Sequence, residues 1–172
     1  MHRLHLLRHA KARRDDAGED RERRLSRSGR DDARLVSESL PAALGTVDLV
    51  LCSSALRTRE TAELALAGFA PRPRILFEDG LYLVGPAALL KRLITLDETA
   101  GAVMVVGHNP GLHELAIALA APDSPDYRAL AQGKFPTAAR ASFAIAAPWS
   151  ALGRSRHELI DYATPKSLGA KD

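Results

Sequence analysis

Three short segments of this 172-residue sequence carry side chains suited to binding an anion and reacting with it. The segments are Arg8-His9, Cys52-Ser53-Ser54 followed by Arg57, and Gly107-His108-Asn109-Pro110-Gly111. Each segment follows a short apolar run that is typical of a buried strand. In open α/β sheets, ligands bind beyond the carboxyl ends of the strands, so a parallel sheet would bring the three segments to one edge.

Two arginines and two histidines at one edge favour phosphate as the anion. A guanidinium group donates two parallel hydrogen bonds to phosphate, and a helix N-terminus near His108-Asn109 adds backbone N–H donors and a positive dipole. A neutral imidazole there can attack phosphorus while the other groups stabilise charge on the equatorial oxygens. Taken alone, His9 is an ordinary structural or solvent-facing histidine, and Arg57 is an ordinary solvated arginine of a first helical turn.

The elements that would position these segments alternate between strands and helices. Strands are predicted over residues 4–7, 48–52, 74–77, 102–106, 142–147 and 158–162, and helices over residues 26 or 28 to 40, 55–66, 86–96 and 112–120. Pro41 is expected to end or kink the first helix, and residues 10–27 and 122–140 are predicted to be loops. The alternation predicts a single α/β domain over residues 1–172, with a central, mostly parallel sheet and helices on both faces.

Composition excludes several classes of protein. Hydrophobic residues make up 46% and charged residues 26%, which rules out a disordered or fibrous chain. The single cysteine excludes a disulfide framework, and no carboxylates at ligand spacing accompany His9 and His108, so no metal is expected. No apolar run approaches the ~18 residues of a membrane span, and residues 1–7 lack a signal-peptide core. We therefore expect a soluble, cytoplasmic protein that does not bind a membrane.

Basic residues gather near the start of the chain. Residues 1–34 hold 11 basic and 7 acidic side chains, although the whole chain has a formal charge of only +3. Nucleic-acid-binding arms usually carry blocks of one sign, whereas acidic residues are interleaved here. We therefore expect no nucleic-acid partner, and either a pocket for an anionic substrate or a solvated loop.

The three segments, in this order, resemble the histidine phosphatase superfamily. The first block is Leu6-Leu7-Arg8-His9-Ala10, with Ala10 where the family usually has glycine, the second is Cys52 to Ala62, and the third is Gly107 to Gly111. The third block has the form typical of the SixA-type branch, the phosphohistidine phosphatases. Further similarities to that branch are Asp20, Arg23, Leu25, Gly29, Leu81-Tyr82 and Pro165-Lys166-Ser167-Leu168. The resemblance therefore spans nearly the whole chain.

The resemblance implies a phosphoglycerate mutase-like fold and a phosphatase that needs no metal or organic cofactor. His9 would be the nucleophile and would form a covalent phosphohistidine. Arg8, Arg57 and His108 would complete the phosphate pocket, and Asn109 would be a further phosphate contact.

Many members of the family also use a carboxylic acid to protonate the leaving alcohol. The candidates here are Glu78 and Asp79, of which we favour Asp79, although both can be plain exposed loop acids. A phosphohistidine needs such an acid less, because its leaving imidazole has an ordinary pKa of ~6.5 and leaves far more easily than an alkoxide.

The size of the chain favours a phosphorylated protein as the substrate. With 172 residues there is little beyond the core to cover the site, although residues 122–140 are a candidate lid. We therefore expect removal of phosphate from phosphohistidine on a partner protein. Two alternatives stay open: a phosphatase of small phosphorylated molecules (phosphomonoesters), and a phosphate-binding module without activity.

Overall fold

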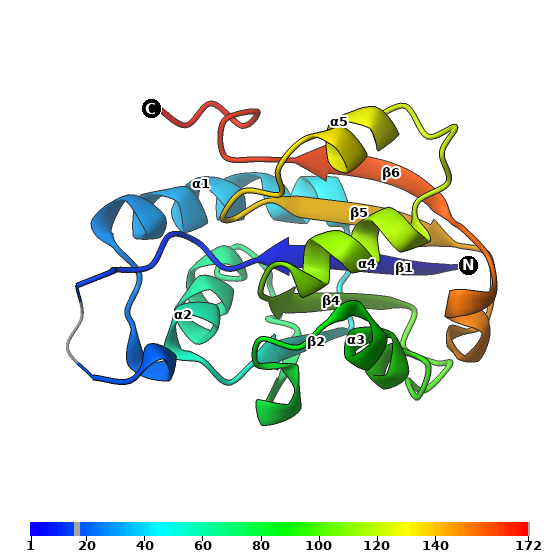
Figure 1. Ribbon diagram of the computed structural model, residues 1–172, viewed down its shortest axis with the longest axis horizontal. Helices are drawn as coiled ribbons and strands as arrows, with labels where there is room; N and C mark the ends of the chain where they lie inside the picture. Colours follow the sequence, from blue (N-terminus) through cyan, green and yellow to red (C-terminus); the bar gives the residue numbers. More distant parts are fainter. Residues whose placement is uncertain (16–17, 172) are drawn as a thin grey trace.

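A six-stranded sheet in the order β3-β2-β4-β1-β5-β6 forms the centre of the computed structural model, which describes residues 1–15 and 18–171. The strands are β1 (His2–Arg8), β2 (Leu49–Ser53), β3 (Arg74–Glu78), β4 (Ala102–Gly107), β5 (Arg140–Ile145) and β6 (Glu158–Ala163). The first four strands run parallel to one another, and β5 and β6 extend the sheet in antiparallel fashion (Figure 1). The predicted α/β fold with a mostly parallel sheet is confirmed, with an antiparallel pair at one side.

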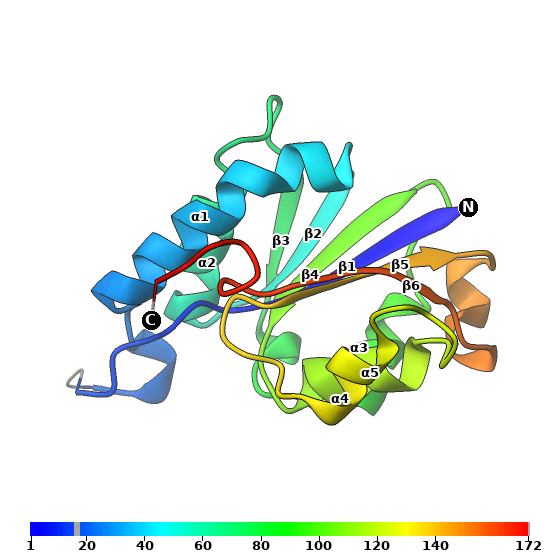
Figure 2. The same cartoon turned by 90° about the horizontal axis from the view of Figure 1, so that it is seen from above.

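Helices cover both faces of the sheet, as predicted. Figure 2 shows α1 and α2 on one face and α3, α4 and α5 on the other. Their bounds are α1 (Arg27–Leu44), α2 (Leu56–Ala65), α3 (Pro86–Leu93), α4 (Gly111–Leu119) and α5 (Tyr127–Gln132), and three short 3₁₀ turns are η1 (Asp20–Glu22), η2 (Asp79–Leu81) and η3 (Trp149–Arg154). Side chains of β1 alternate between the faces, so that Leu4 and Leu6 join one core cluster and Leu7 joins the other. Among the described residues, no helix combines the length and apolarity that crossing a membrane requires.

The first helix continues past the proline that was expected to mark its end. Ser26 caps α1, because its hydroxyl accepts a hydrogen bond from the Gly29 N–H at 3.0 Å. Pro41 lies inside the last turn, and the helix runs on to Leu44, which is buried. Burial of this apolar side chain stabilises the extra turn, and Gly45 then closes the helix with a positive φ of 68°.

The predicted loop over residues 122–140 contains a helix. The segment folds into α5, which has one buried apolar side chain, Leu130, and packs beside α4 through a hydrogen bond between His113 Nε2 and the Leu130 carbonyl at 2.7 Å. A single buried position in six residues produces no periodicity, which is why the pattern did not indicate a helix. After α5, the chain passes the carboxyl edge of the sheet before β5 begins at Arg140.

Candidate active site

The parallel strands β1 and β4 end side by side, and Figure 1 shows both ends at the same edge of the sheet. Arg8 is paired with Gly107, and the backbone N–H of His9 donates to the Gly107 carbonyl at 3.1 Å. The imidazole rings of His9 and His108 consequently lie 5.4 Å apart between centroids. β2 contributes Ser53, whose hydroxyl lies 2.7 Å from His108 Nε2. The structure thus brings the three predicted segments together.

His9 is held in one orientation and in its neutral form. Its Nδ1–H donates to the carbonyl of Ala10 at 2.7 Å, which leaves the Nε2 lone pair free. Burial, together with the positive charges of Arg8, Arg57 and Arg23, lowers the pKa of His9 to about 4, although the Ala10 hydrogen bond opposes the shift. At neutral pH the ring therefore carries an unprotonated Nε2, which is the form a nucleophile requires.

The turn after His9 is anchored to α2. The Ala10 N–H donates to the Thr61 hydroxyl at 2.9 Å, and that hydroxyl donates to the Arg57 carbonyl at 2.7 Å. Ala10 itself is completely buried, so a small residue fits at this position. The turn that carries His9 and the helix that carries Arg57 are therefore linked directly.

The guanidinium of Arg8 is oriented by the segment that follows α5. Its Nη1 donates to the Phe135 carbonyl at 3.1 Å, and Asn109 Nδ2 donates to the same carbonyl at 2.8 Å. Burial, together with the nearby charge of Arg57, lowers the pKa of Arg8. Two like charges held close together are stabilised by an anion between them.

Arg57 is buried and not solvated, in contrast to the ordinary expectation for a first-turn arginine. Its side chain is 2% exposed, because η1 packs over the start of α2. Both terminal nitrogens of Arg57 bond to Asp20, Nη1 to the carbonyl at 2.9 Å and Nη2 to Oδ2 at 2.9 Å. The contact between Asp20 and Arg57 was not predicted from the sequence, and it fixes the plane of the guanidinium.

His108 forms the opposite wall. Burial, together with His9 and Arg57, lowers its pKa to about 3, although the charge of Asp20 opposes the shift. The ring of Tyr82 meets the ring of His108 edge-on, with centroids 5.5 Å apart. The imidazole is thus fixed between Ser53 and Tyr82 and is neutral at physiological pH.

Several buried polar atoms at this edge have no hydrogen-bond partner in the described protein. Five side-chain atoms are in this condition, and four of them belong to the site: Arg8 Nε, Arg57 Nε, His108 Nδ1 and Asn109 Oδ1. Leaving a buried polar group unpaired costs about 1–3 kcal/mol, so such atoms are rarely gathered without a function. Two of them are obligatory cationic donors, which suits a bound oxyanion.

These side chains line a cavity of about 330 Å³. Its lining includes five cationic side chains, which are Arg8, Lys11, Arg14, Arg23 and Arg57. The only carboxylate among its described lining residues is Asp20. A larger hollow, of about 560 Å³, lies between the loop after α1 and residues 68–74, and none of its described lining residues is a histidine or a cysteine. The smaller cavity is therefore the candidate site.

Asp20 lines the cavity, and its carboxylate accepts hydrogen bonds from three neighbouring side chains. Arg57 and Arg23 bond to its carboxylate, the latter from Nε to Oδ1 at 3.0 Å, and the Tyr82 hydroxyl donates to Oδ2. These bonds lower the pKa of Asp20 to about 2, with Tyr82 making the largest contribution. Sequence reasoning matched Asp20, Arg23 and Tyr82 to a family pattern but assigned no role to Asp20. The match to that pattern was the only feature of the sequence that pointed to Asp20 as a site residue.

Glu78 and Asp79 are not brought into the cavity. Glu78 is held by Arg92 through two bonds, from Nε at 2.8 Å and from Nη2 at 2.9 Å. Asp79 is an exposed residue that accepts a hydrogen bond from Arg21 Nη1 at 3.1 Å, and hydrogen bonds from Ser54 and Arg21 lower its pKa. Neither carboxyl group lines the cavity, and both are in contact with cationic partners.

Comparisons with known proteins agree with one another. The model of the histidine phosphatase superfamily (branch 1) matches residues 4–81. An uncharacterized protein of Mycobacterium tuberculosis is 32% identical over 163 residues, which cover 93% of this chain and all of that protein. The solved structure of a protein from Nakamurella multipartitia, assigned as the phosphohistidine phosphatase SixA, has a TM-score of 0.83 and 28% identity, with 95% of this chain and 96% of that chain covered. A second structure with that assignment, from Agrobacterium tumefaciens, has a TM-score of 0.80 and 28% identity, with 95% and 98% covered.

Proposed function

This chain belongs to the SixA-type branch of the histidine phosphatase superfamily and is a phosphatase, and we propose that it removes phosphate from phosphohistidine on a partner protein, with His9 as the nucleophile. In this proposal Arg8, Arg57 and His108 bind the phosphoryl oxygens through the donors that have no partner within the protein. Asn109 orients Arg8 by sharing the Phe135 carbonyl with it.

The observation that carries the proposal is a neutral nucleophile in a cavity without a protonated acid. Asp20 is the only carboxylate among the described lining residues, and its pKa of about 2 keeps it ionised. An alkoxide leaving group needs a proton donor, which typically contributes 10²–10⁴-fold in rate. An imidazole whose other ring nitrogen carries a proton leaves as the neutral base, whose conjugate acid has an ordinary pKa of ~6.5, and needs no acid from the protein. The site therefore favours a phosphoramidate over a phosphate ester.

The reaction proceeds in two displacements. His9 Nε2 attacks phosphorus, and the bond between phosphorus and the substrate imidazole breaks, with its electron pair passing to the ring nitrogen. The imidazole leaves as the neutral base, because its other ring nitrogen carries a proton. Water then attacks the phosphorus of phospho-His9, the P–Nε2 bond breaks, and inorganic phosphate leaves. Charge on the equatorial oxygens is stabilised in both steps by Arg8 and Arg57.

A rapid-quench experiment tests this proposal. The protein is mixed with free phosphohistidine and, separately, with p-nitrophenyl phosphate, and is then analysed by intact mass and by peptide mapping under alkaline conditions. We expect one phosphoryl group on His9, formed and turned over faster with phosphohistidine. The variant His9→Ala should form no adduct, and His5→Ala, which alters a buried histidine on the same strand, should behave as wild type.

Other outcomes assign the protein differently. Faster turnover of the aryl ester would identify a phosphatase of small phosphomonoesters and would return attention to Glu78 and Asp79. Tight binding of inorganic phosphate without any adduct or turnover would identify a binding module. An adduct on a residue other than His9 would overturn the proposed mechanism.

A further inference from the structure

A second hollow, of about 200 Å³, adjoins the cavity, and Thr137 lines both. Its other lining residues include Lys166 and Lys171 of the C-terminal segment and Asp32 of α1. Figure 2 shows this segment passing beside α1 and over the chain that leaves β1. The two hollows are thus neighbours on either side of Thr137, and we call them together the groove.

The C-terminal segment has a defined structure that holds its lysines in place. Residues 164–169 form a turn in which the Leu168 N–H donates to the Thr164 carbonyl at 3.0 Å, and the Ala170 N–H donates to the Pro165 carbonyl at 2.9 Å. Leu168 packs against the core cluster beneath α1. Lys166 lies within this anchored turn and Lys171 follows it, and both side chains are exposed. Their position beside Thr137 is therefore a feature of the fold.

The groove is strongly basic. Its lining residues include seven cationic side chains and two carboxylates, which are Asp20 and Asp32. Within residues 1–15 and 18–171, no carboxylate lies within ion-pairing distance of Lys11, Lys166 or Lys171 (the ion pairs of the groove involve arginines). Lys11 is attracted to Asp32, so the charge left uncompensated for an approaching partner is that of Lys166 and Lys171.

We propose that this groove docks an acidic segment of the phosphorylated partner protein, adjacent to the phosphohistidine that enters the cavity. The inference rests on the proposed function, and it identifies how a protein substrate is recognised. Charge complementarity of this kind steers association and selects partners more than it adds affinity. Nucleic acid is disfavoured, because no Phe, Tyr or Trp is found among the described lining residues on which bases would stack.

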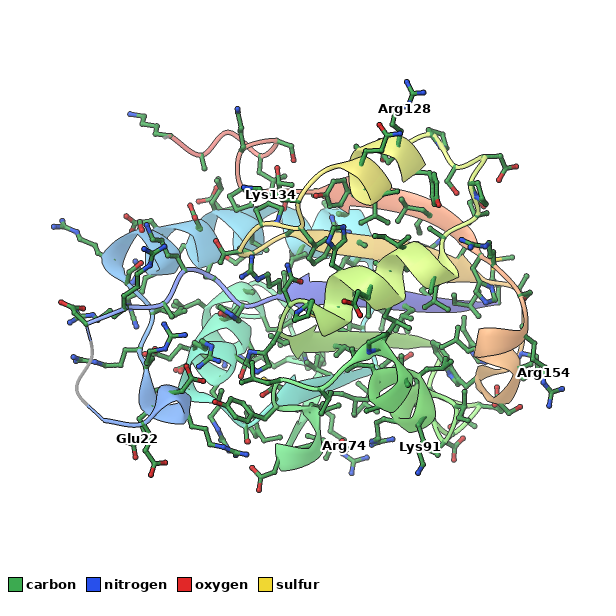
Figure 3. The ribbon with its side chains drawn as sticks, in the orientation of Figure 1. Glu22, Arg74, Lys91, Arg128, Lys134 and Arg154 are labelled. Atoms are coloured by element: carbon green, nitrogen blue, oxygen red, sulfur yellow. The ribbon has the colours of Figure 1, made fainter. Side chains whose placement is uncertain are left out.

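Peptides that differ only in charge test this proposal. Two histidine peptides, one flanked by Asp and Glu and the other by Asn and Gln, are phosphorylated with potassium phosphoramidate and assayed beside free phosphohistidine. The enzymes are wild type, the double variant Lys166→Glu/Lys171→Glu, and the matched double variant Lys91→Glu/Arg154→Glu. Figure 3 shows Lys91 and Arg154 on the surface well apart from the C-terminal segment, so the control makes the same change of charge elsewhere.

Wild type should hydrolyse the acidic peptide with a kcat/KM about tenfold above that of the neutral peptide at low ionic strength. The preference should reside in KM, should disappear in Lys166→Glu/Lys171→Glu and should persist in the control. High salt should weaken it, because the charges are exposed. Free phosphohistidine should be hydrolysed equally by all three enzymes.

Three results would overturn the inference. Equal kcat/KM for the two peptides with wild type would refute docking, while hydrolysis of free phosphohistidine would show that the proposed function stands. Equal loss of preference in both double variants would assign the effect to net charge alone. An oligonucleotide could also bind more tightly than the acidic peptide and inhibit wild type but not Lys166→Glu/Lys171→Glu. That result would reassign the groove to nucleic acid. Failure to hydrolyse any phosphohistidine substrate would instead refute the proposed function.

Discussion

Two clusters in this protein are built from the same three residue types, and one of them has the features of a catalytic site. His9, Arg57 and Asp20 lie at the carboxyl edge of the sheet, and His5, Arg140 and Asp161 lie within it across β1, β5 and β6. The two arginines are almost completely buried, at 2% and 3% exposure, and each bonds to a half-exposed aspartate. Burial lowers the pKa of both histidines, His9 to about 4 and His5 to about 3.

Access and the number of unpaired polar atoms among the described residues distinguish the clusters, because the unpaired atom of the second cluster is His5 Nε2 and the other four lie at the site. His5 is 0% exposed inside the sheet, where Nδ1 lies 2.7 Å from the Ser142 hydroxyl, and that hydroxyl also accepts from Arg140. His9 lines a cavity, next to four buried polar atoms that have no partner. A depressed pKa therefore reports burial in both places, and only the gathering of cationic and unpaired polar groups around a cavity indicates a phosphate site.

Removal of each histidine is the strongest test of this comparison. We expect His9→Ala to lose at least ~10³-fold in kcat on free phosphohistidine, because the variant lacks the proposed nucleophile. His5→Ala should retain kcat within about twofold, since His5 does not reach the cavity. Steady-state phosphate release measures both. A large loss of activity in His5→Ala, with its circular dichroism spectrum unchanged, would erase the distinction between the clusters.

The two histidines should be indistinguishable by titration. With folded pKa values of about 4 and about 3, both rings should stay neutral at pH 5, where a histidine with the ordinary pKa of 6.5 is mostly protonated. Long-range ¹H–¹⁵N spectra should show His9 with its proton on Nδ1, because that atom donates to the Ala10 carbonyl. Titration of His9 near pH 6.5, or a proton on Nε2, would remove the basis for a neutral nucleophile. Loss of the corresponding peaks in His9→Ala and His5→Ala provides the assignment.

The arginines provide a test that is independent of the histidines. Arg57→Lys should lower kcat/KM by about 10²-fold, because an ammonium cannot replace the planar fork that bonds Asp20 and faces the phosphoryl group. Arg140→Lys is the matched control, since Arg140 is equally buried and also bonds to an aspartate. It should lose stability without losing kcat/KM. Comparable losses of activity in the two variants would show that buried guanidinium groups act here through the fold.

The comparison also shows which parts of the site can be predicted from sequence. The strand ends that carry Arg8-His9 and His108 follow apolar runs, and the rule that ligands bind at the carboxyl edge of a parallel sheet then places them together. That part of the prediction needs only local patterns and one topological rule. The α/β fold and the helices on both faces follow from the same alternation.

The rest depends on contacts between segments without a local pattern. Asp20 meets Arg57 because η1 folds over α2, and its stretch of charged residues has no apolar periodicity from which that packing could be predicted. Glu78 follows a strand as expected, but its pairing with Arg92 of α3 depends on how that helix packs. Sequence reasoning therefore identified the groups that follow strands and missed the carboxylate that lines the cavity.

The smallest effect we expect is a decrease in the free energy of unfolding in His5→Ala. The informative quantity is how this decrease depends on pH. At pH 7 the variant should be less stable by about 2 kcal/mol, from the cavity it leaves and the lost bond to Ser142. In wild type, the folded pKa of His5 lies below the unfolded value, so its contribution is present above pH ~6.5 and is lost as the pH falls towards about 3. The variant lacks this loss, so the difference should shrink by ~1.4 kcal/mol per pH unit and nearly vanish at about pH 5. Urea denaturation at both pH values measures it, and a difference that stays constant would mean that His5 is protonated in the native sheet and that its resemblance to His9 is only geometric.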